Sequence, residues 1–265
     1  MKPLFRHVMA LHRKMGKREL MIFLDFDGTL SPIVPRPADA HLPRAEKHLL
    51  DLLRRRSEGG VAIVSGRARK DLKRKVALEG IFYVGNHGLE IEGPQLRFQA
   101  PGTTGSRKAL SELKRKLSRV TADVPGTEME DKGLSMSLHY RRTKAKNIPA
   151  LRRAFLDAAG PYISSRKIRV TEGKRVFEIR PPVNWHKGSA VRWLLRYRRR
   201  SGRAFFPIYI GDDVTDEDAF AAVRRVGLGI RVGCRSDSQA AYCLERRSQV
   251  VRLLQELLRR QENRR

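Results

Sequence analysis

Short apolar runs alternate with amphipathic stretches along the first hundred residues. The segment 19–27 is an apolar run that ends in two acids, which predicts a buried strand. Residues 43–57 have helical spacing, and two further runs of β-favouring residues follow at 61–64 and 81–84. Strands that alternate with helices are typical of a parallel α/β sheet.

The pattern changes after about residue 100 and returns near residue 184. Between these points the expected order is helix, two strands, helix and two strands, at 105–121, 127–131, 134–141, 147–159, 167–171 and 175–180. This order predicts an inserted α+β domain over 101–183. The α/β pattern then resumes with a helix from about 187, strands at 205–210 and 227–232, and a last helix at about 247–260. We therefore predict a Rossmann-like parallel-sheet core built from 1–100 and 184–265.

Composition limits the protein class. Hydrophobic residues make up 40% of the chain, which is enough for a packed core, and we find no apolar run as long as the roughly 18 residues of a membrane span. The first twenty residues are basic throughout and lack an apolar signal region, so we predict a surface helix or arm there. Cys234 and Cys243 match neither a metal-ligand pattern nor a disulfide framework, which fits a reducing, cytoplasmic compartment.

The net charge of +28 is extreme and keeps a non-enzymatic alternative open, a basic nucleic-acid-binding protein. Aromatic residues make up only 7% of the chain, and no basic patch is interleaved with them. We therefore do not expect specific nucleic-acid binding, and the arginine runs are interpreted as solvated helix faces.

The strongest chemical signal is the sequence Asp-Phe-Asp-Gly-Thr at the end of the first strand. Asp25 and Asp27 share one face of an extended segment. Phosphoryl transfer needs a carboxylate nucleophile, a proton donor for the leaving oxygen and a metal ion. The alternative is a polar turn in which an aspartate caps the next segment, but two acids after an apolar strand are costly without a cation. A calcium-binding EF-hand is excluded, because the glycine is misplaced and no glutamate closes the loop.

Other polar groups also follow predicted strands. Ser65 suits either phosphate binding or a helix N-cap. Lys187 suits phosphate, although the chain contains 56 lysines and arginines. The stretch 211–218 contains five acids and suits a magnesium ion, or in part the first turn of a helix. His87 is a weaker candidate.

The order of these motifs resembles the haloacid dehalogenase superfamily, and more narrowly its trehalose-phosphatase family. The residues that carry the resemblance are Asp25–Ile33, Pro35, Pro37, Ser65–Arg67, Gly85–Gly88, Glu90, Glu130–Lys132, His139–Arg141, Lys174–Glu178 and Gly211–Asp218. The resemblance runs from about residue 20 to 232. It implies a core of haloacid dehalogenase type with an inserted cap, and Mg²⁺-dependent hydrolysis of trehalose 6-phosphate. Sucrose 6-phosphate and mannosyl-3-phosphoglycerate remain alternative substrates.

The resemblance also implies individual roles. Asp25 would be the nucleophile that becomes an aspartyl phosphate, and Asp27 the acid and base. Ser65 and Lys187 would hold phosphoryl oxygens. Mg²⁺ would be bound by Asp25, the backbone carbonyl of Asp27 and Asp212, with Asp213 or Asp216 in the outer shell of the metal site. The substrate-binding residues would be Gly28, Thr29, Arg67, Asn86, His87, Glu130, Lys132, Arg141, Lys174 and Glu178. We expect a monomer whose partner is a small-molecule sugar phosphate.

Overall fold

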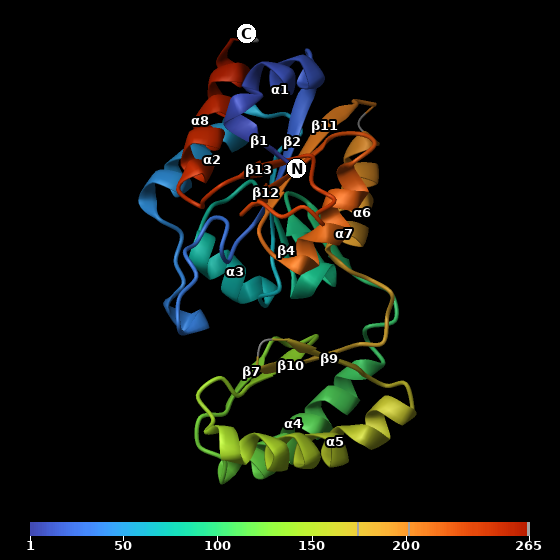
Figure 1. The fold of residues 1–265 in the computed structure, drawn as a ribbon. Helices are drawn as coiled ribbons and strands as arrows, with labels where there is room; N and C mark the ends of the chain where they lie inside the picture. Colours follow the sequence, from blue (N-terminus) through green and yellow to red (C-terminus); the bar gives the residue numbers. More distant parts are fainter. Residues whose placement is uncertain (174, 201, 264–265) are drawn as a thin grey trace. The chain divides into compact units, whose positions relative to one another are not determined.

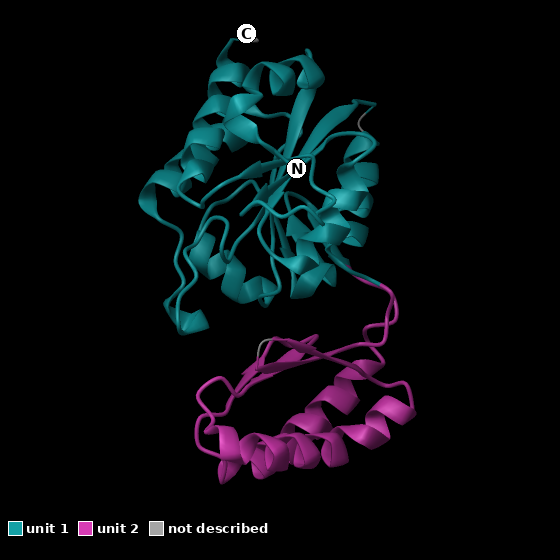
Figure 2. Cartoon of the chain, viewed as in Figure 1, with its two compact units in different colours: residues 1–98, 185–265 teal, residues 99–184 magenta. Residues whose placement is uncertain are grey.

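The computed structural model describes residues 1–173, 175–200 and 202–263. The chain divides into two compact units, which Figure 2 shows in different colours. The core unit comprises residues 1–98 and 185–265, and the inserted unit comprises residues 99–184. No helix among the described residues has the length and apolar character that a bilayer crossing requires.

The core unit is built on a mostly parallel sheet (Figure 1). Within the described residues its nine strands follow the order β1 (Lys2–Pro3), β13 (Tyr242–Leu244), β12 (Leu228–Val232), β11 (Phe205–Gly211), β2 (Glu19–Asp25), β3 (Val61–Val64), β4 (Phe82–Gly85), β5 (Glu90–Gly93) and β6 (Leu96–Gln99). The pairs from β1 through β4 are parallel, and β5 runs antiparallel to β4. This arrangement confirms the predicted α/β core.

Helices cover both faces of this sheet (Figure 1). One face packs against α1 (Val8–Met15), α2 (Arg44–Arg56), α3 (Arg69–Val76) and α8 (Gln249–Glu262), and the other against α6 (Lys187–Arg199) and α7 (Glu217–Val223). Along β2, Ile22 and Leu24 enter the first core and Phe23 enters the second. Strand β2 reads as a continuous apolar run because both of its faces are buried.

The sequence pattern missed several short strands and one disulfide bond. The N-terminal segment forms β1, which was not predicted, and the expected helix, α1, which leaves Arg13 and Lys14 exposed and buries Leu11 and Met15. Strands β5, β6 and β13 were also not predicted. The expectation of two unpaired cysteines was wrong, because Cys234 and Cys243 form a disulfide. Strand β13 lies beside β12, and this pairing brings together two cysteines whose spacing alone gave no signal.

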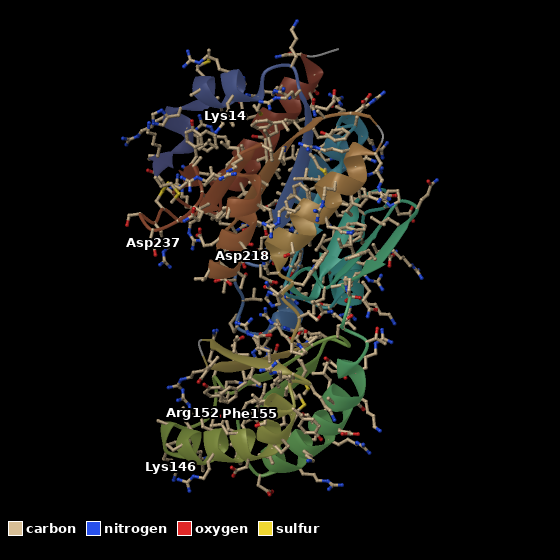
Figure 3. All side chains as sticks on the ribbon, turned by 90° about the vertical axis from the view of Figure 1, so that its right-hand side faces the viewer. Lys14, Lys146, Arg152, Phe155, Asp218 and Asp237 are labelled. Carbon is tan, nitrogen blue, oxygen red and sulfur yellow. A yellow bond between two sulfur atoms is a disulfide. The ribbon has the colours of Figure 1, made fainter. Side chains whose placement is uncertain are left out.

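The inserted unit is a four-stranded antiparallel sheet covered by two helices. Its elements are α4 (Ser106–Ala122), β7 (Glu128–Asp131), β8 (Met136–His139), α5 (Ile148–Ser164), β9 (Arg169–Gly173) and β10 (Val176–Arg180). Phe155 of α5, which Figure 3 labels, stacks on Phe177 of β10 with ring centroids 4.0 Å apart. Because the alternate residues of β8 and β10 pack on the helices, the opposite face of this sheet carries the polar side chains.

Candidate active site

The carboxyl ends of β2, β3 and β11 meet at one edge of the core sheet. Strand β2 lies between β3 and β11, so Asp25, Ser65 and Asp212 are brought to neighbouring strand ends. Lys187 is the first residue of α6 and joins them from another part of the chain. Ligands of open α/β sheets bind beyond this edge, which makes it the candidate active site.

Three carboxylates converge at this edge. One oxygen each of Asp25, Asp212 and Asp216 lie within 4.8 Å of one another. The ammonium of Lys187 lies 2.7 Å from Asp25 Oδ1 and 2.7 Å from Asp216 Oδ1, and its side chain is only 3% exposed. The acids from two distant stretches of sequence therefore share one site.

The charges in this cluster do not balance. Burial raises the pKa of Asp25 well above its ordinary value, with Lys187 opposing that rise and Asp216 and Asp212 adding to it. Burial, followed by the charge of Asp216, raises the pKa of Asp212 to about 6. Burial alone would lower the pKa of Lys187, but Asp216 and Asp25 outweigh it and raise this pKa. Three acids around one ammonium leave excess negative charge, which a cation would relieve.

Asp216 accepts hydrogen bonds that hold its neighbours in the cluster in place. Its Oδ1 accepts hydrogen bonds from Lys187 (2.7 Å) and from the hydroxyl of Tyr209 (2.6 Å). Its Oδ2 accepts the backbone N–H groups of Asp212 (3.0 Å) and Asp213 (2.9 Å). These four bonds use the full acceptor capacity of a carboxylate. Asp25 and Asp212 are therefore the carboxylates best able to bind a cation.

Asp213 has a different place from the other acids. Its exposed side chain accepts the backbone N–H of Asp216 and caps the turn at Val214–Asp216. Among the described acids, the cluster at the sheet edge includes Asp216 and not Asp213. The adjacent residues Asp212 and Asp213 thus have different roles. Asp212 contributes a carboxylate to the site, and Asp213 caps the following turn.

Asp27 is held by an arginine. Arg67 donates from Nε to Asp27 Oδ2 (2.7 Å) and from Nη2 to Asp27 Oδ1 (2.6 Å), and it also binds Asp71 at 3.0 Å. The guanidinium is buried, whereas the Asp27 side chain is 41% exposed. Ser65 Oγ accepts the backbone N–H of Arg67 at 3.1 Å, so the serine also shapes this turn. The two acids of the first motif thus have distinct partners, which are Lys187 for Asp25 and Arg67 for Asp27.

The backbone after Asp27 lies directly against Asp212. Thr29 Oγ1 donates to Asp212 Oδ1 at 3.1 Å. Gly28 has φ of +89°, and a Cβ at this position would collide with the Asp212 carboxylate. Glycine is therefore required here both for its conformation and for the close approach.

Asn86 and His87 support the serine turn. The backbone N–H groups of Asn86 and His87 donate to the carbonyls of Arg67 (2.7 Å) and Ser65 (3.0 Å). Both residues have a left-handed backbone conformation, with φ of +50° and +55°. The Asn86 side chain donates to Glu90 at 2.6 Å and is fully buried. In this structure Asn86 shapes the loop that carries Ser65.

Two further residues beside the site were not identified from the sequence. Tyr209 is a buried residue of β11 that donates to Asp216. Arg231 is a buried residue of β12 that donates to the carbonyls of Asp212 and Asp213. A charged residue within an apolar strand was the available signal for Arg231, since buried charges are almost always paired.

The inserted unit has its own polar cluster, on the face of the sheet opposite its helices. The ammonium of Lys132 lies 3.7 Å from Glu130 Oε2 and 3.5 Å from Glu178 Oε2, with its side chain 6% exposed. Ser137 donates to Glu178 Oε1 at 3.0 Å. Arg141 is exposed in the turn after β8, and Lys174 lies outside the described residues.

The sequence matches a known family over most of its length. The profile of the trehalose-phosphatase family matches residues 23–248. The chain is 38% identical over 212 residues to a trehalose-phosphate phosphatase of Mycobacterium avium, covering 79% of this chain and 53% of that protein. It is 32% identical over 255 residues to trehalose-phosphate phosphatase B of Arabidopsis thaliana, covering 91% of this chain and 67% of that protein. The chain thus spans about half of the mycobacterial relative.

Solved structures have the same fold. A crystal structure of a trehalose-6-phosphate phosphatase related protein superposes with a TM-score of 0.77 at 27% identity, covering 91% of this chain and 99% of the other. The C-terminal domain of Candida albicans trehalose-6-phosphate phosphatase gives a TM-score of 0.79 at 21% identity, covering 97% and 98%. A haloacid dehalogenase-like hydrolase from Bacteroides thetaiotaomicron gives 0.62 at 14% identity, covering 91% and 100%. At these identities the last two comparisons support the fold only.

Proposed function

The chain belongs to the trehalose-phosphatase family, and from this membership we propose that it hydrolyses trehalose 6-phosphate to trehalose and phosphate. It is accordingly a phosphoric monoester hydrolase. The observation that carries the chemistry is the convergence of Asp25 and Asp212 within 4.8 Å, beside the ammonium of Lys187. This arrangement provides a nucleophile, a cation site and a fixed positive charge at one strand edge.

In the proposed reaction, a carboxylate oxygen of Asp25 attacks the phosphorus and the bond from phosphorus to the sugar oxygen breaks. Asp27 enters this step protonated and gives its proton to the departing sugar oxygen. A water molecule then gives a proton to Asp27 and attacks the phosphorus, which releases phosphate and restores Asp25. Lys187 supports the first step because it holds Asp25 Oδ1 at 2.7 Å and fixes the orientation of the carboxylate.

We propose Mg²⁺ as the cofactor, bound by Asp25, Asp212 and the backbone carbonyl of Asp27. The donors fit a hard cation, because they are oxygens and because burial, together with the charge of Asp216, raises the pKa of both carboxyl groups. When bound, the ion would neutralise charge on the transferring phosphoryl group. Asp216 has no role as a direct ligand in this proposal, because its acceptor capacity is used by Lys187, Tyr209 and two backbone N–H groups.

Arg67 is proposed to orient Asp27. Its two hydrogen bonds to both oxygens of Asp27 form a bidentate pair, which fixes the plane of the carboxylate. This role replaces the substrate contact that the resemblance implied for Arg67. Ser65 is 1% exposed and is proposed to hold a phosphoryl oxygen together with Lys187.

The inserted unit is proposed to act as the cap that recognises the sugar. Its polar sheet face combines an ammonium with two carboxylates, at Lys132, Glu130 and Glu178. Sugar hydroxyls both donate and accept, so a mixed set of this kind suits them. Lys174 and Arg141 remain proposed contacts from the sequence motif.

The test is phosphate release from trehalose 6-phosphate with Mg²⁺ and after treatment with a chelator. We expect release that depends on Mg²⁺ and exceeds release from sucrose 6-phosphate and mannosyl-3-phosphoglycerate. The Asp25→Asn variant is the matched control for contaminating phosphatases. Equal turnover of all three substrates would contradict the assigned substrate, and full activity in the chelator would contradict the cation site.

A further inference from the structure

The guanidinium of Arg231 contacts the turn that carries Asp212. Arg231 lies on β12, and its side chain is 6% exposed. Its Nη1 donates to the Asp213 carbonyl (3.1 Å), and its Nη2 donates to the Asp212 carbonyl. The same Nη1 donates to Glu217 Oε1 at 2.8 Å. One rigid side chain therefore links the backbone of the acidic turn to the start of α7.

Glu217 in turn joins Arg231 to a loop that the disulfide closes. Glu217 Oε2 accepts the Ser238 hydroxyl (3.1 Å) and the Gln239 backbone N–H (2.7 Å). Both donors lie in the segment 234–243, whose ends are the bonded cysteines; Asp237 marks this segment in Figure 3. Cys243 on β13 is also the register partner of Arg231 on β12.

We propose that Arg231 is a positioning residue for the cation-binding turn, and that the segment 234–243 fixes its orientation through Glu217. The inference rests on the proposed function, because it assumes that Asp212 binds the cation. Backbone carbonyls held on a buried guanidinium keep the turn in one conformation, and this conformation directs the Asp212 carboxylate to the cluster with Asp25. Outer-sphere contacts of this kind commonly change metal affinity by about 10- to 100-fold.

The sign of the effect separates positioning from charge. Arg231 is a cation, so by Coulomb's law alone its removal would strengthen the binding of another cation at Asp212. If Arg231 acts by holding the turn, its removal weakens that binding. Arg231→Met removes both the charge and the hydrogen bonds. Arg231→Lys keeps the charge, but an ammonium lacks the planar set of N–H donors that contacts two carbonyls and Glu217 at once.

The experiment measures Mn²⁺ binding to the 265-residue chain by electron paramagnetic resonance of the free ion. We expect both Arg231 variants to bind Mn²⁺ roughly tenfold more weakly. The Mg²⁺ concentration for half-maximal phosphate release should rise by the same factor, with kcat at saturating Mg²⁺ nearly unchanged. Arg260 is the matched control, since it is 7% exposed and donates to the carbonyls of Gly16 (2.6 Å) and Arg18 (3.0 Å). We expect Arg260→Lys to lower thermal stability without changing Mn²⁺ affinity.

Unchanged or tighter Mn²⁺ binding by Arg231→Met would overturn the inference, even if the melting temperature falls. Should neither Arg231 variant fold, Glu217→Asp tests the same network, because it keeps the charge and shortens the side chain. We expect it to weaken Mn²⁺ binding severalfold, and unchanged affinity would count against the inference. If the unaltered protein fails to bind Mn²⁺, the proposed function loses its cation site, which is a different failure.

Reduction of the disulfide tests the contribution of the segment 234–243. A dithiol reductant transfers two electrons and two protons to the Cys234–Cys243 bond; the protein gains two thiols, and the reductant forms its own disulfide. We expect reduction to weaken Mn²⁺ binding severalfold in the unaltered protein and to have no further effect in Arg231→Met, since both changes act on one turn. An equal loss in both proteins would show that the loop acts independently of Arg231. The variant with Cys234→Ser and Cys243→Ser controls for reductant that binds the metal.

Discussion

Two lysines illustrate the difference between the two units. Lys187 in the core unit and Lys132 in the inserted unit are each nearly excluded from solvent between two acids, with side chains 3% and 6% exposed. Lys187 lies at hydrogen-bonding distance, 2.7 Å, from both carboxylates. Lys132 lies 3.5 and 3.7 Å from its carboxylates, beyond the usual length of a strong charged hydrogen bond.

The acids around these lysines differ in the same way. Asp216 accepts four hydrogen bonds within the core unit. Glu178 Oε2 is a buried oxygen with no hydrogen-bond partner among the described residues of the inserted unit. A cluster with all its hydrogen bonds made holds its atoms in place for a reaction, whereas a buried acceptor that lacks a hydrogen bond suits a ligand. We therefore expect variants of Asp25 and Lys187 to change kcat and a variant of Lys132 to change KM.

The largest expected effect is that of Asp25→Asn. The substitution removes the nucleophile but keeps the side-chain shape, so kcat should fall by about 10⁴-fold or more. Phosphate release measures the loss, and thermal unfolding shows whether the fold is retained. Substantial activity in a folded Asp25→Asn protein would refute the assigned nucleophile.

Lys187→Met should follow, with kcat lower by roughly 10²- to 10³-fold because a fixed charge on the reacting groups is lost. It also leaves Asp25 and Asp216 buried without their ammonium. Breaking a buried ion pair in this way costs about 3–5 kcal/mol in the free energy of unfolding. Chemical denaturation measures this cost, and an unchanged free energy of unfolding would contradict the buried network.

Lys132→Met should raise KM for trehalose 6-phosphate by about 10- to 100-fold, the equivalent of one lost charged hydrogen bond, with little change in kcat. Lys114 supplies a matched control in the same unit, since its ion pair with Asp131 (2.7 Å) is 45% exposed on both sides. We expect Lys114→Met to leave KM unchanged. A fall in kcat at constant KM for Lys132→Met would erase the contrast between the two lysines.

Thr29→Val should have the smallest effect. It removes one hydrogen bond to Asp212 Oδ1. A hydrogen bond to a charged acceptor contributes at most about 1.5–3 kcal/mol, and it contributes less where water can replace it. We expect the Mg²⁺ concentration for half-maximal activity to rise severalfold in a titration of the variant. An unchanged midpoint would show that Thr29 does not orient Asp212.

The meeting of Asp25 with Asp212 could be predicted from the sequence because the ends of parallel strands share one edge. The apolar runs at 19–27 and 205–210, each followed by acids, contain that information. Strands β1 and β13 could not be predicted, because segments of two and three residues are too short to show a period.

Side-chain partners were less accessible to prediction. The Arg67–Asp27 pair and the contacts of Arg231 depend on rotamers and on backbone carbonyls, which leave no spacing pattern. The Cys234–Cys243 disulfide likewise depends on β13 adding beside β12, and β13 was not predicted. Prediction therefore reached the strand-end residues and Lys187, but not Tyr209 and Arg231, which hold the acidic turn in place.

The central claim is that Asp25 carries the phosphoryl group, and the most direct test is to trap that intermediate. The enzyme would be mixed with trehalose 6-phosphate and Mg²⁺, quenched within one turnover and reduced with borohydride, which converts an aspartyl phosphate to homoserine. Peptide mass spectrometry should then find homoserine at position 25 and at no other aspartate. Rapid hydrolysis with an unmodified Asp25, or with homoserine at another aspartate, would contradict the account.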